Sequence, residues 1–385
     1  MEKNNKPDLI LLGVSAILVL SGILILTSVS ASFSLQKFGT TLYFLNHQLL
    51  FGLVPGLVLG SVAFFMPLNF FKRFSFFLLF LNILFLGMVF LPGIGGNIGG
   101  VYRWIFFGPF SFQPSEFLKV TLIVYGAAWL ATRTKSLLRS NTKSPRGFWI
   151  HGSWSQTFIP FSLMIGVISV FLILQPDIST LGIIGITALI MYFTAPTPVW
   201  HTILMAGGGI IALGAIIRLA PYRLSRLASF FDPSFDPLGQ GYQIKQALIG
   251  IGSGGLTGVG LGLSFQKFGV LPEPISDSIF AVFSEEMGFL GGSFLILLFL
   301  LFAWRSFLIA KKIREDTFAQ LAVVGIASWI CLQAFINMGS MIGIVPIAGI
   351  PLPFISYGGS ALAAELIALG IILNISRRLN SGQVR

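Results

Sequence analysis

Apolar stretches long enough to cross a lipid bilayer recur along almost the whole chain. About 20 helical residues span the hydrocarbon core of a membrane, so each stretch is a candidate membrane span. Only 10% of the 385 residues are charged, compared with about a quarter in soluble domains. We therefore expect an all-α, polytopic membrane protein that forms a single domain over residues 1–385. The ten predicted spans are residues 9–29, 44–66, 73–92, 115–132, 156–174, 178–195, 197–219, 278–304, 317–345 and 354–376.

The lysines and arginines divide unevenly between the two sides of this predicted bundle. The formal net charge of +11 is compatible with nucleic-acid binding. If the N-terminus lies in the cytoplasm, however, most basic residues fall in cytoplasmic segments, and the short outer loops contain only Lys37 and Arg103. This asymmetry follows the positive-inside rule, so we expect both termini in the cytoplasm and no nucleic-acid partner.

One connection is much longer than the others, at residues 220–277 between the seventh and eighth spans. Loops longer than about 15 residues are usually functional or disordered. This loop has helical spacing at 223–231 and 241–251, and a glycine-rich segment at 250–262. The glycine-rich segment lacks the ending of a phosphate-binding loop, so its glycines are expected to allow tight turns and close backbone packing. We expect an ordered extracytoplasmic layer of short helices that covers a cavity in the bundle.

Four of the 13 acidic residues lie close together where the eighth span begins: Glu273, Asp277, Glu285 and Glu286. Asp277 is a candidate catalytic carboxylate, and a simple helix N-cap is the alternative. Asp277 and Glu285 share one helix face, with Glu285 about 12 Å deeper. A carboxylate at that depth needs a partner or a wet cavity, so we expect Glu285 in a polar pocket. Glu286 points elsewhere and is expected to pair with another span.

The fourth span opens with "QPSEFLK", which contains Glu116 and Lys119. These residues are three apart on a helix and can neutralise each other. Alternatively, Lys119 reaches Asp277 and holds its carboxylate ionised, because a nearby cation favours the charged form. An ionised carboxylate at this position can accept a proton from a substrate hydroxyl. Asp177, in the "QPD" turn between the fifth and sixth spans, is expected to cap the sixth span or to support the same polar network.

Basic residues in the predicted outer segments surround this acidic mouth. Arg103, Arg223, Arg226 and Lys267 suggest an anionic ligand such as a pyrophosphate, although solvated or lipid-facing side chains are the alternative. The three histidines are far apart, so a structural zinc site is not expected.

These stretches, in this order, resemble the motifs of the shape, elongation, division and sporulation family of FtsW, RodA and SpoVE. The resemblance extends from the first span to the last. It includes "QPSEFLK", "QPD", "YRLSRLASFFDPSFDPLGQGYQ", "SDSIFAVFSEEMGF" and "PIAGIPLPFISYGGSA". The stretches "YFLNHQLLFG" and "LGIILNISRR" look more similar to the division members, with FtsW the closest, than to the elongation members.

The resemblance implies a bacterial peptidoglycan glycosyltransferase in the cytoplasmic (inner) membrane that polymerises lipid II at the outer face. The implied partners are a class B penicillin-binding transpeptidase and other membrane proteins of the division machinery. The family's proposed catalytic acid corresponds to Asp277, and its "ExxK" pair corresponds to Glu116 and Lys119. The neighbours Ile275 and Ser278 differ from the residues that the family often has there.

The implied reaction is an inverting glycosyl transfer. The donor is the growing glycan, linked to a polyprenyl pyrophosphate, and the acceptor is the 4-hydroxyl of the next lipid II, whose proton passes to Asp277. The leaving pyrophosphate would be stabilised by the basic residues Arg103, Lys119, Arg223 and Lys267, with Glu116, Asp177 and Glu285 as supporting groups. A divalent cation such as Mg²⁺ or Mn²⁺ could assist, although no ligand set in the sequence fixes a metal. Apolar grooves between spans would hold the polyprenyl tails.

Three alternatives remain open at the level of sequence. One is an elongation-type polymerase of the RodA kind. Another is a lipid II flippase or other transporter, which would require ionisable groups near the membrane midplane, and Glu365 is the best candidate for one. The last is a non-enzymatic scaffold of the division machinery.

Overall fold

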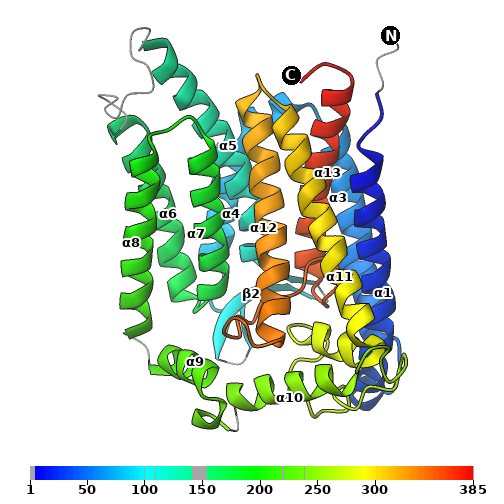
Figure 1. The fold of residues 1–385 in the computed structure, drawn as a ribbon. Helices are drawn as coiled ribbons and strands as arrows, with labels where there is room; N and C mark the ends of the chain where they lie inside the picture. Colours follow the sequence, from blue (N-terminus) through cyan, green and yellow to red (C-terminus); the bar gives the residue numbers. More distant parts are fainter. Residues whose placement is uncertain are drawn as a thin grey trace.

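The computed structural model describes residues 5–98, 100–108, 110–140, 154–218, 221–237 and 239–384. Long helices run roughly side by side and form an upright bundle (Figure 1). Both termini lie at one end of this bundle, which we call the terminal end. Two short helices lie across the opposite end, which we call the loop end.

Each predicted span overlaps a helical segment over most of its length, which confirms the all-α membrane class; the spans predicted at 73–92, 317–345 and 354–376 extend up to five residues beyond their helices. Among the described residues, eight segments are long and apolar enough to cross a membrane, and α7 is apolar but shorter. The exact number of spans therefore stays a prediction. The segments of the bundle are α1 (Leu9–Phe38), α2 (Tyr43–Gln48) continuing through a π-helical turn (Leu49–Leu53) into α3 (Val54–Phe65), α4 (Leu68–Met88), α5 (Pro114–Ser140), α6 (Ile159–Leu174) preceded by a π-helical turn (Trp154–Phe158), α7 (Ile178–Thr194), α8 (Val199–Arg218), α11 (Ile279–Lys312), α12 (Thr317–Met341) and α13 (Gly359–Asn380).

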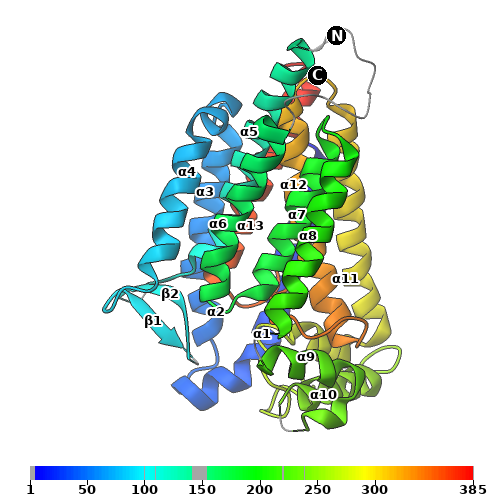
Figure 2. The same cartoon turned by 90° about the vertical axis from the view of Figure 1, so that its left-hand side faces the viewer.

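A small antiparallel sheet, absent from the sequence prediction, follows α4 near the loop end (Figure 2). Its strands are β1 (Gly95–Ile98), β2 (Val101–Phe107) and β3 (Phe110–Phe112), with β2 in the middle. The β2 sequence "VYRWIFF" is rich in β-branched and aromatic residues, which favour a pleated, half-buried surface. Ile105 is fully buried, whereas Tyr102 and Phe106 are exposed. The sheet places Arg103 at the loop end.

The core of the bundle is formed by α12 and α13, which are buried along most of their length. Neighbouring helices surround α12, namely α5, α7, α11 and α13. Small residues bring α13 against α3: a Cβ at Gly370 would lie 2.2 Å from the carbonyl oxygen of Gly60. Close backbone contact of this kind is typical of helix pairs in membranes.

The long loop forms short helices at both places where the sequence predicted them, 223–231 and 241–251. It forms α9 (Pro221–Phe231), a 3-10 turn (Pro233–Phe235) and α10 (Gln240–Ser253), followed by glycine-containing turns. Helices α9 and α10 lie across the loop end (Figure 1). Buried residues such as Ile244 and Ala247 face the bundle, and α10 packs on α11 and α12.

The glycine-rich segment of the loop binds to the backbone of α11 where that helix is interrupted. Gly288 has φ 63° and ψ −165°, so the helical backbone is interrupted there. Segment 255–260 forms four backbone hydrogen bonds around this break. The amides of residues 259 and 260 donate to the carbonyls of Glu285 and Glu286, at 3.0 and 3.1 Å. The amides of residues 289 and 290 donate to the carbonyls of residues 255 and 256, at 2.9 and 3.1 Å. These bonds matter because water cannot satisfy backbone groups at membrane depth.

The predicted role of the glycines, close backbone packing, is confirmed at this break. A Cβ at Gly258 would lie 2.1 Å from the carbonyl oxygen of Glu286, and Gly258 has a φ of +85°. A Cβ at Gly288 would lie 2.4 Å from the amide nitrogen of Gly258. Any other residue at these two positions would force the loop away from α11.

Candidate active site

Asp277 lies at the loop end, immediately before α11, and its side chain is half-buried. The helix begins at Ile279 with Ser278 as its N-cap, and no side chain caps it. No described residue donates a hydrogen bond to the Asp277 carboxylate, and no described Lys or Arg forms an ion pair with it. The alternative interpretation of Asp277 as a helix N-cap is therefore wrong, and its carboxylate is available for other chemistry.

The backbone around this carboxylate is held firmly, although no described residue pairs with the carboxylate itself. Each of four consecutive residues accepts one hydrogen bond from a different donor. The carbonyl of Asp277 accepts from Nδ2 of Asn337 on α12, at 2.8 Å. The other three bonds run from the Tyr357 amide to the Ile275 carbonyl at 2.9 Å, from Ser356 Oγ to the Ser276 carbonyl, and from Gln243 Nε2 to Ser278 Oγ at 3.0 Å. This arrangement fixes the base of the Asp277 side chain.

Burial raises the pKa of Asp277 from its ordinary value of 3.8 to about 7, and the negative charge of Glu273 raises it further. The positive charges of Arg226 and Arg103 act in the opposite direction and lower the pKa. A proton acceptor works best when its pKa lies near the operating pH. Asp277 is therefore suited to proton transfer near neutral pH.

Arg103 has a structural contact as well as an electrostatic one. Its Nε donates to the carbonyl of Gln175 at 2.9 Å, and its Nη2 donates to the carbonyl of Pro176. Arg103 therefore holds the "QPD" turn between α6 and α7. In the same turn, Asp177 accepts from the amide of Thr180 at 3.3 Å, which confirms that Asp177 caps the sixth predicted span.

The other predicted basic ligands lie on the long loop. Arg226 on α9 is exposed and contributes a positive potential at Asp277. Arg223 also belongs to α9, but its side chain lies outside what the structure describes, so its role stays a prediction.

Lys267 already has a carboxylate partner, so the prediction that it binds the leaving pyrophosphate is wrong. Its ammonium is buried and forms an ion pair with Glu286 at 2.9 Å, and it also donates to the carbonyl of Ser28 on α1 at 3.4 Å. Glu286 also accepts from Ser28 Oγ at 2.7 Å. A buried carboxylate needs a charged partner, and the loop supplies it. The prediction that Glu286 pairs with another span is confirmed.

Glu285 occupies a polar pocket, as predicted, but the long loop forms that pocket. Its carboxylate accepts from the amides of Phe265 and Gln266 at 3.1 and 3.3 Å and from the hydroxyl of Ser264. Glu285 therefore fixes the loop to α11 and is enclosed by it.

Glu116 and Lys119 neutralise each other inside the bundle, at a distance of 2.7 Å. The predicted direct pairing of Lys119 with Asp277 is not formed, and the self-neutralised alternative is correct. Lys119 also donates to Oε1 of Gln333 at 2.8 Å and lies 5.0 Å from the ring centroid of Trp329. The pairing follows from helix geometry, because residues three apart lie on one face.

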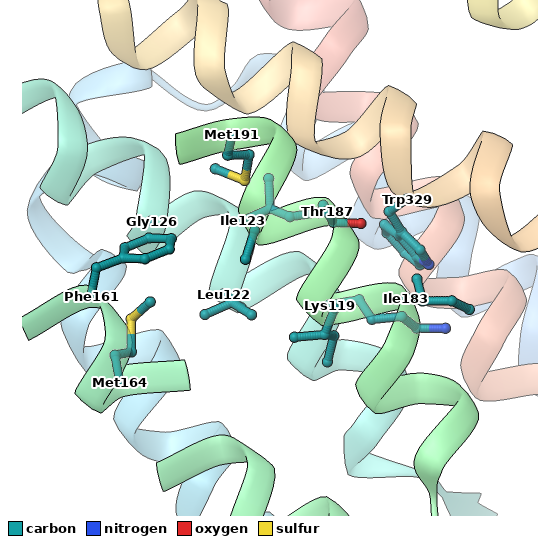
Figure 3. Close-up of a pocket in the computed structure, with 12 residues that line it drawn as sticks. Lys119, Leu122, Ile123, Gly126, Phe161, Met164, Ile183, Thr187, Met191 and Trp329 are labelled. Atoms are coloured by element: carbon teal, nitrogen blue, oxygen red, sulfur yellow. The ribbon is translucent and has the colours of Figure 1, made fainter. Parts of the chain in front are cut away.

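A small apolar cavity lies beside this ion pair, between α5, α6, α7 and α12 (Figure 3). The stem of Lys119 lines it, together with Phe161, Met164 and Trp329, and its volume of about 10 Å³ is close to that of one water molecule. This cavity is too small and too apolar to be the substrate site.

A larger apolar groove of about 790 Å³ lies between α1 and α11 on the loop half of the bundle. Ser28, Leu261, Phe283 and Phe294 are among the residues that line it. Two further grooves, of about 410 and 700 Å³, lie nearer the terminal end. Grooves of this size offer apolar surface to long lipid chains.

Glu365 has a structural partner. It is fully buried in α13, and its Oε2 accepts from the amide of Phe354 at 2.7 Å. Phe354 has a φ of +63°, so this bond stabilises an uncommon backbone conformation in the "PLPFISYGG" segment.

Sequence reasoning missed two functional candidates on α12, Gln333 and Asn337. Both are buried amides four residues apart in an apolar helix. Buried polar groups in a membrane span are costly and usually functional, so this pattern could have identified them. Among the described residues, no three histidine, cysteine or acidic side chains lie close enough together to hold a metal ion.

The fold and the site together define a polytopic helical membrane protein with a carboxylate site at its loop end. The sequence model of the FtsW, RodA and SpoVE family, described as "Cell cycle protein", matches residues 8–381. The chain belongs to this family.

Similar proteins cover nearly the whole chain. The stage V sporulation protein E of Bacillus subtilis is 37% identical, over 97% of this chain and 98% of its own. The probable peptidoglycan glycosyltransferase FtsW of Saccharophagus degradans is also 37% identical, over 97% of this chain and 93% of its own. Among solved structures, a chain reported under "Structural coordination of polymerization and crosslinking by a peptidoglycan synthase complex" matches with a TM-score of 0.75 and 27% identity, over 97% of this chain and 98% of its own. The rod shape determining protein RodA of Thermus thermophilus matches with a TM-score of 0.68 and 25% identity, over 97% of both chains.

Proposed function

We propose that this protein is a peptidoglycan glycosyltransferase that polymerises lipid II into glycan strands for septal cell-wall synthesis. Its relatives carry the name of this activity, and the family relationship extends over the whole chain. The single observation that carries the catalytic proposal is Asp277: its carboxylate accepts no hydrogen bond from the described residues, its backbone is fixed, and its pKa is about 7.

In the proposed reaction, Asp277 accepts the proton of the 4-hydroxyl of an incoming lipid II. The hydroxyl oxygen forms a bond to the anomeric carbon of the growing glycan. The bond from that carbon to the pyrophosphate oxygen breaks on the opposite side, so the configuration inverts and polyprenyl pyrophosphate leaves. General-base assistance of this kind contributes about 10²- to 10⁴-fold in rate.

Positive charge at the loop end would stabilise the leaving pyrophosphate. Arg226 and Arg103 already act on the carboxylate through space, and Arg223 is a further candidate on α9. Charge that is fixed before the reaction stabilises the transition state without reorganisation cost. A Mg²⁺ or Mn²⁺ ion held mainly by the pyrophosphate oxygens and water could share this task, because Mg²⁺ commonly binds substrate phosphates and keeps several waters.

The groove between α1 and α11 supports a lipid-linked substrate, because it opens apolar surface on the same half of the molecule as Asp277. The distribution of basic residues favours both termini in the cytoplasm of a bacterium, which would put the loop end at the outer face of the membrane. Lipid II polymerisation would then take place where Asp277 lies.

A class B penicillin-binding transpeptidase is the proposed partner, together with other division proteins of the membrane. The solved complex that this chain resembles couples polymerisation to crosslinking, as reported in its name. A division role is favoured over an elongation role because several relatives are named FtsW. A flippase is disfavoured because Glu365, its best candidate residue, binds the backbone of Phe354.

The decisive experiment is polymerisation of purified lipid II by the protein in detergent, alone and with its transpeptidase, analysed by gel electrophoresis of the glycan strands. We expect polymer from the wild-type protein and none from the Asp277→Asn variant. Absence of polymer under both conditions would favour a transporter or a scaffold. Complementation of cells depleted of either the division or the elongation member would distinguish those two roles.

A further inference from the structure

We infer that Gln333 and Asn337 on α12 form an amide ladder that fixes Asp277 to the buried Glu116–Lys119 pair, and that Asn337 is a positioning residue for the reaction. This inference rests on the proposed function, because it assigns a task to Asn337 in the same site.

Asn337 forms the end of this ladder that contacts Asp277. Its Nδ2 donates to the carbonyl of Asp277 and to the carbonyl of Ile350, at 2.8 Å in both cases. Only 1% of its surface is exposed. One side chain therefore joins the residue that carries the carboxylate to the "PLPFISYGG" segment, and both are anchored to the most deeply buried part of the bundle.

Gln333 forms the other end of the ladder, one helical turn before Asn337 in α12. Its Oε1 accepts from Nζ of Lys119 and from Nε1 of Trp329, at 2.8 Å in both cases. Its Nε2 donates to the carbonyl of Pro351 at 3.0 Å. Gln333 therefore connects the Lys119 ammonium to the residue that follows Ile350.

The two amides meet on adjacent carbonyls, those of Ile350 and Pro351. A displacement of Lys119 is thus transmitted to the segment that Asn337 holds, and from there to the backbone of Asp277. The ladder lies inside a well-packed helix bundle, where amide hydrogen bonds are strong because water does not compete for them. A shift of about 1 Å at a reacting group can cost about 10²-fold in rate.

The chain contains a matched control for Asn337. Asn374 on α13 is also fully buried, and its Nδ2 donates to the carbonyls of Ala63 and Met66 at 2.9 and 2.6 Å. It joins α13 to the end of α3 at the terminal end of the bundle, far from Asp277 along the helices. Asn337→Leu and Asn374→Leu thus both remove two bonds from a buried amide to backbone carbonyls, at two different places, and Asn374→Leu also removes the bond that Asn374 Oδ1 accepts from Arg378 Nε at 2.9 Å.

The test measures turnover, the apparent KM for lipid II and the apparent melting temperature of both variants. We expect Asn337→Leu to lower turnover about 100-fold with KM changed less than about twofold, because only the geometry of the proton acceptor is lost. Asn374→Leu should lower the melting temperature comparably but keep turnover within about threefold of wild type. Equal losses of turnover in both variants, or normal turnover in Asn337→Leu, would overturn the positioning role.

A second measurement does not depend on activity. The melting temperature of the wild-type protein should fall between pH 5 and pH 8, because Asp277 is ionised in the unfolded chain over that range but keeps its proton in the folded protein up to about pH 7. In Asn337→Leu the freed segment lets water reach Asp277, so this fall should become smaller, whereas Asn374→Leu should keep it. If the melting temperature of Asn337→Leu falls with pH as much as that of the wild-type protein, the ladder is refuted. This result does not depend on whether any of the proteins polymerises lipid II.

Discussion

Replacing Asp277 by Asn should remove activity and stabilise the fold at the same time. The pKa of Asp277 is about 7 when folded, against 3.8 for an ordinary Asp. Because the folded form keeps its proton to higher pH, the free energy of unfolding falls as the pH rises from about 4 to about 7. Asparagine has no proton to lose, so the variant avoids this loss.

The size of the effect follows from the shift. About three pKa units at 1.36 kcal/mol each set an upper limit of about 4 kcal/mol above pH 7. The carboxylate is half-buried, so water screens part of its charge, and about 2 kcal/mol is a realistic value. At about 2 °C per kcal/mol for a chain of this size, Asp277→Asn should melt about 4 °C above wild type at pH 8 and close to wild type at pH 4.

Thermal unfolding in detergent, followed by intrinsic fluorescence at both pH values, measures this difference. Asp232→Asn is the control, because Asp232 lies on the same loop but its pKa is lowered by hydrogen bonds from Ser234. That variant should gain no stability at pH 8 and should keep its activity. If Asp277→Asn melts at or below the wild-type temperature at pH 8, the carboxylate is not destabilised by burial and the reasoning fails.

Three further predictions follow from contacts at the loop end. The acid limb of the polymerisation pH profile should lie near pH 7, shift to lower pH in Glu273→Gln and shift to higher pH in Arg226→Gln; rates that change without any shift of the midpoint would contradict this. Gly258→Ala should prevent stable folding, as judged by gel filtration, whereas Gly252→Ala, where a Cβ meets nothing within 4 Å, should be tolerated. Lys267→Met should lower the free energy of unfolding by about 3–5 kcal/mol, because it leaves the buried carboxylate of Glu286 uncompensated. Adding Glu286→Gln to this variant should recover most of the lost stability in a melting experiment.

The helices could be predicted from the sequence because apolar length is a local property, and every predicted span overlaps a helical segment, although several ends are wrong by up to five residues. The sheet could not, because a short apolar run such as "VYRWIFF" suits a strand or a helix equally well until its neighbours are known. The acidic cluster could be found from composition alone, since carboxylates are rare in this chain.

The partners of charged residues were harder to predict. Lys119 has a partner three residues away, and local geometry favours that partner over a residue on another helix. Lys267 was predicted to bind an anionic ligand because it is basic and lies in the long loop, but its ammonium forms an ion pair with Glu286. Neutral amides such as Asn337 carry no charge signal, and their role depends on carbonyls that only the fold brings together.

The break in α11 bears on how the protein is made. A helix interrupted at Gly288 leaves backbone groups that lipid cannot satisfy, so α11 is complete only when segment 255–260 is already in place. That segment precedes the break by about 30 residues and therefore leaves the ribosome first. Docking of the loop and insertion of α11 are then one coupled step, and a chain whose loop is delayed would enter the membrane with an unfinished helix that quality-control proteases can recognise.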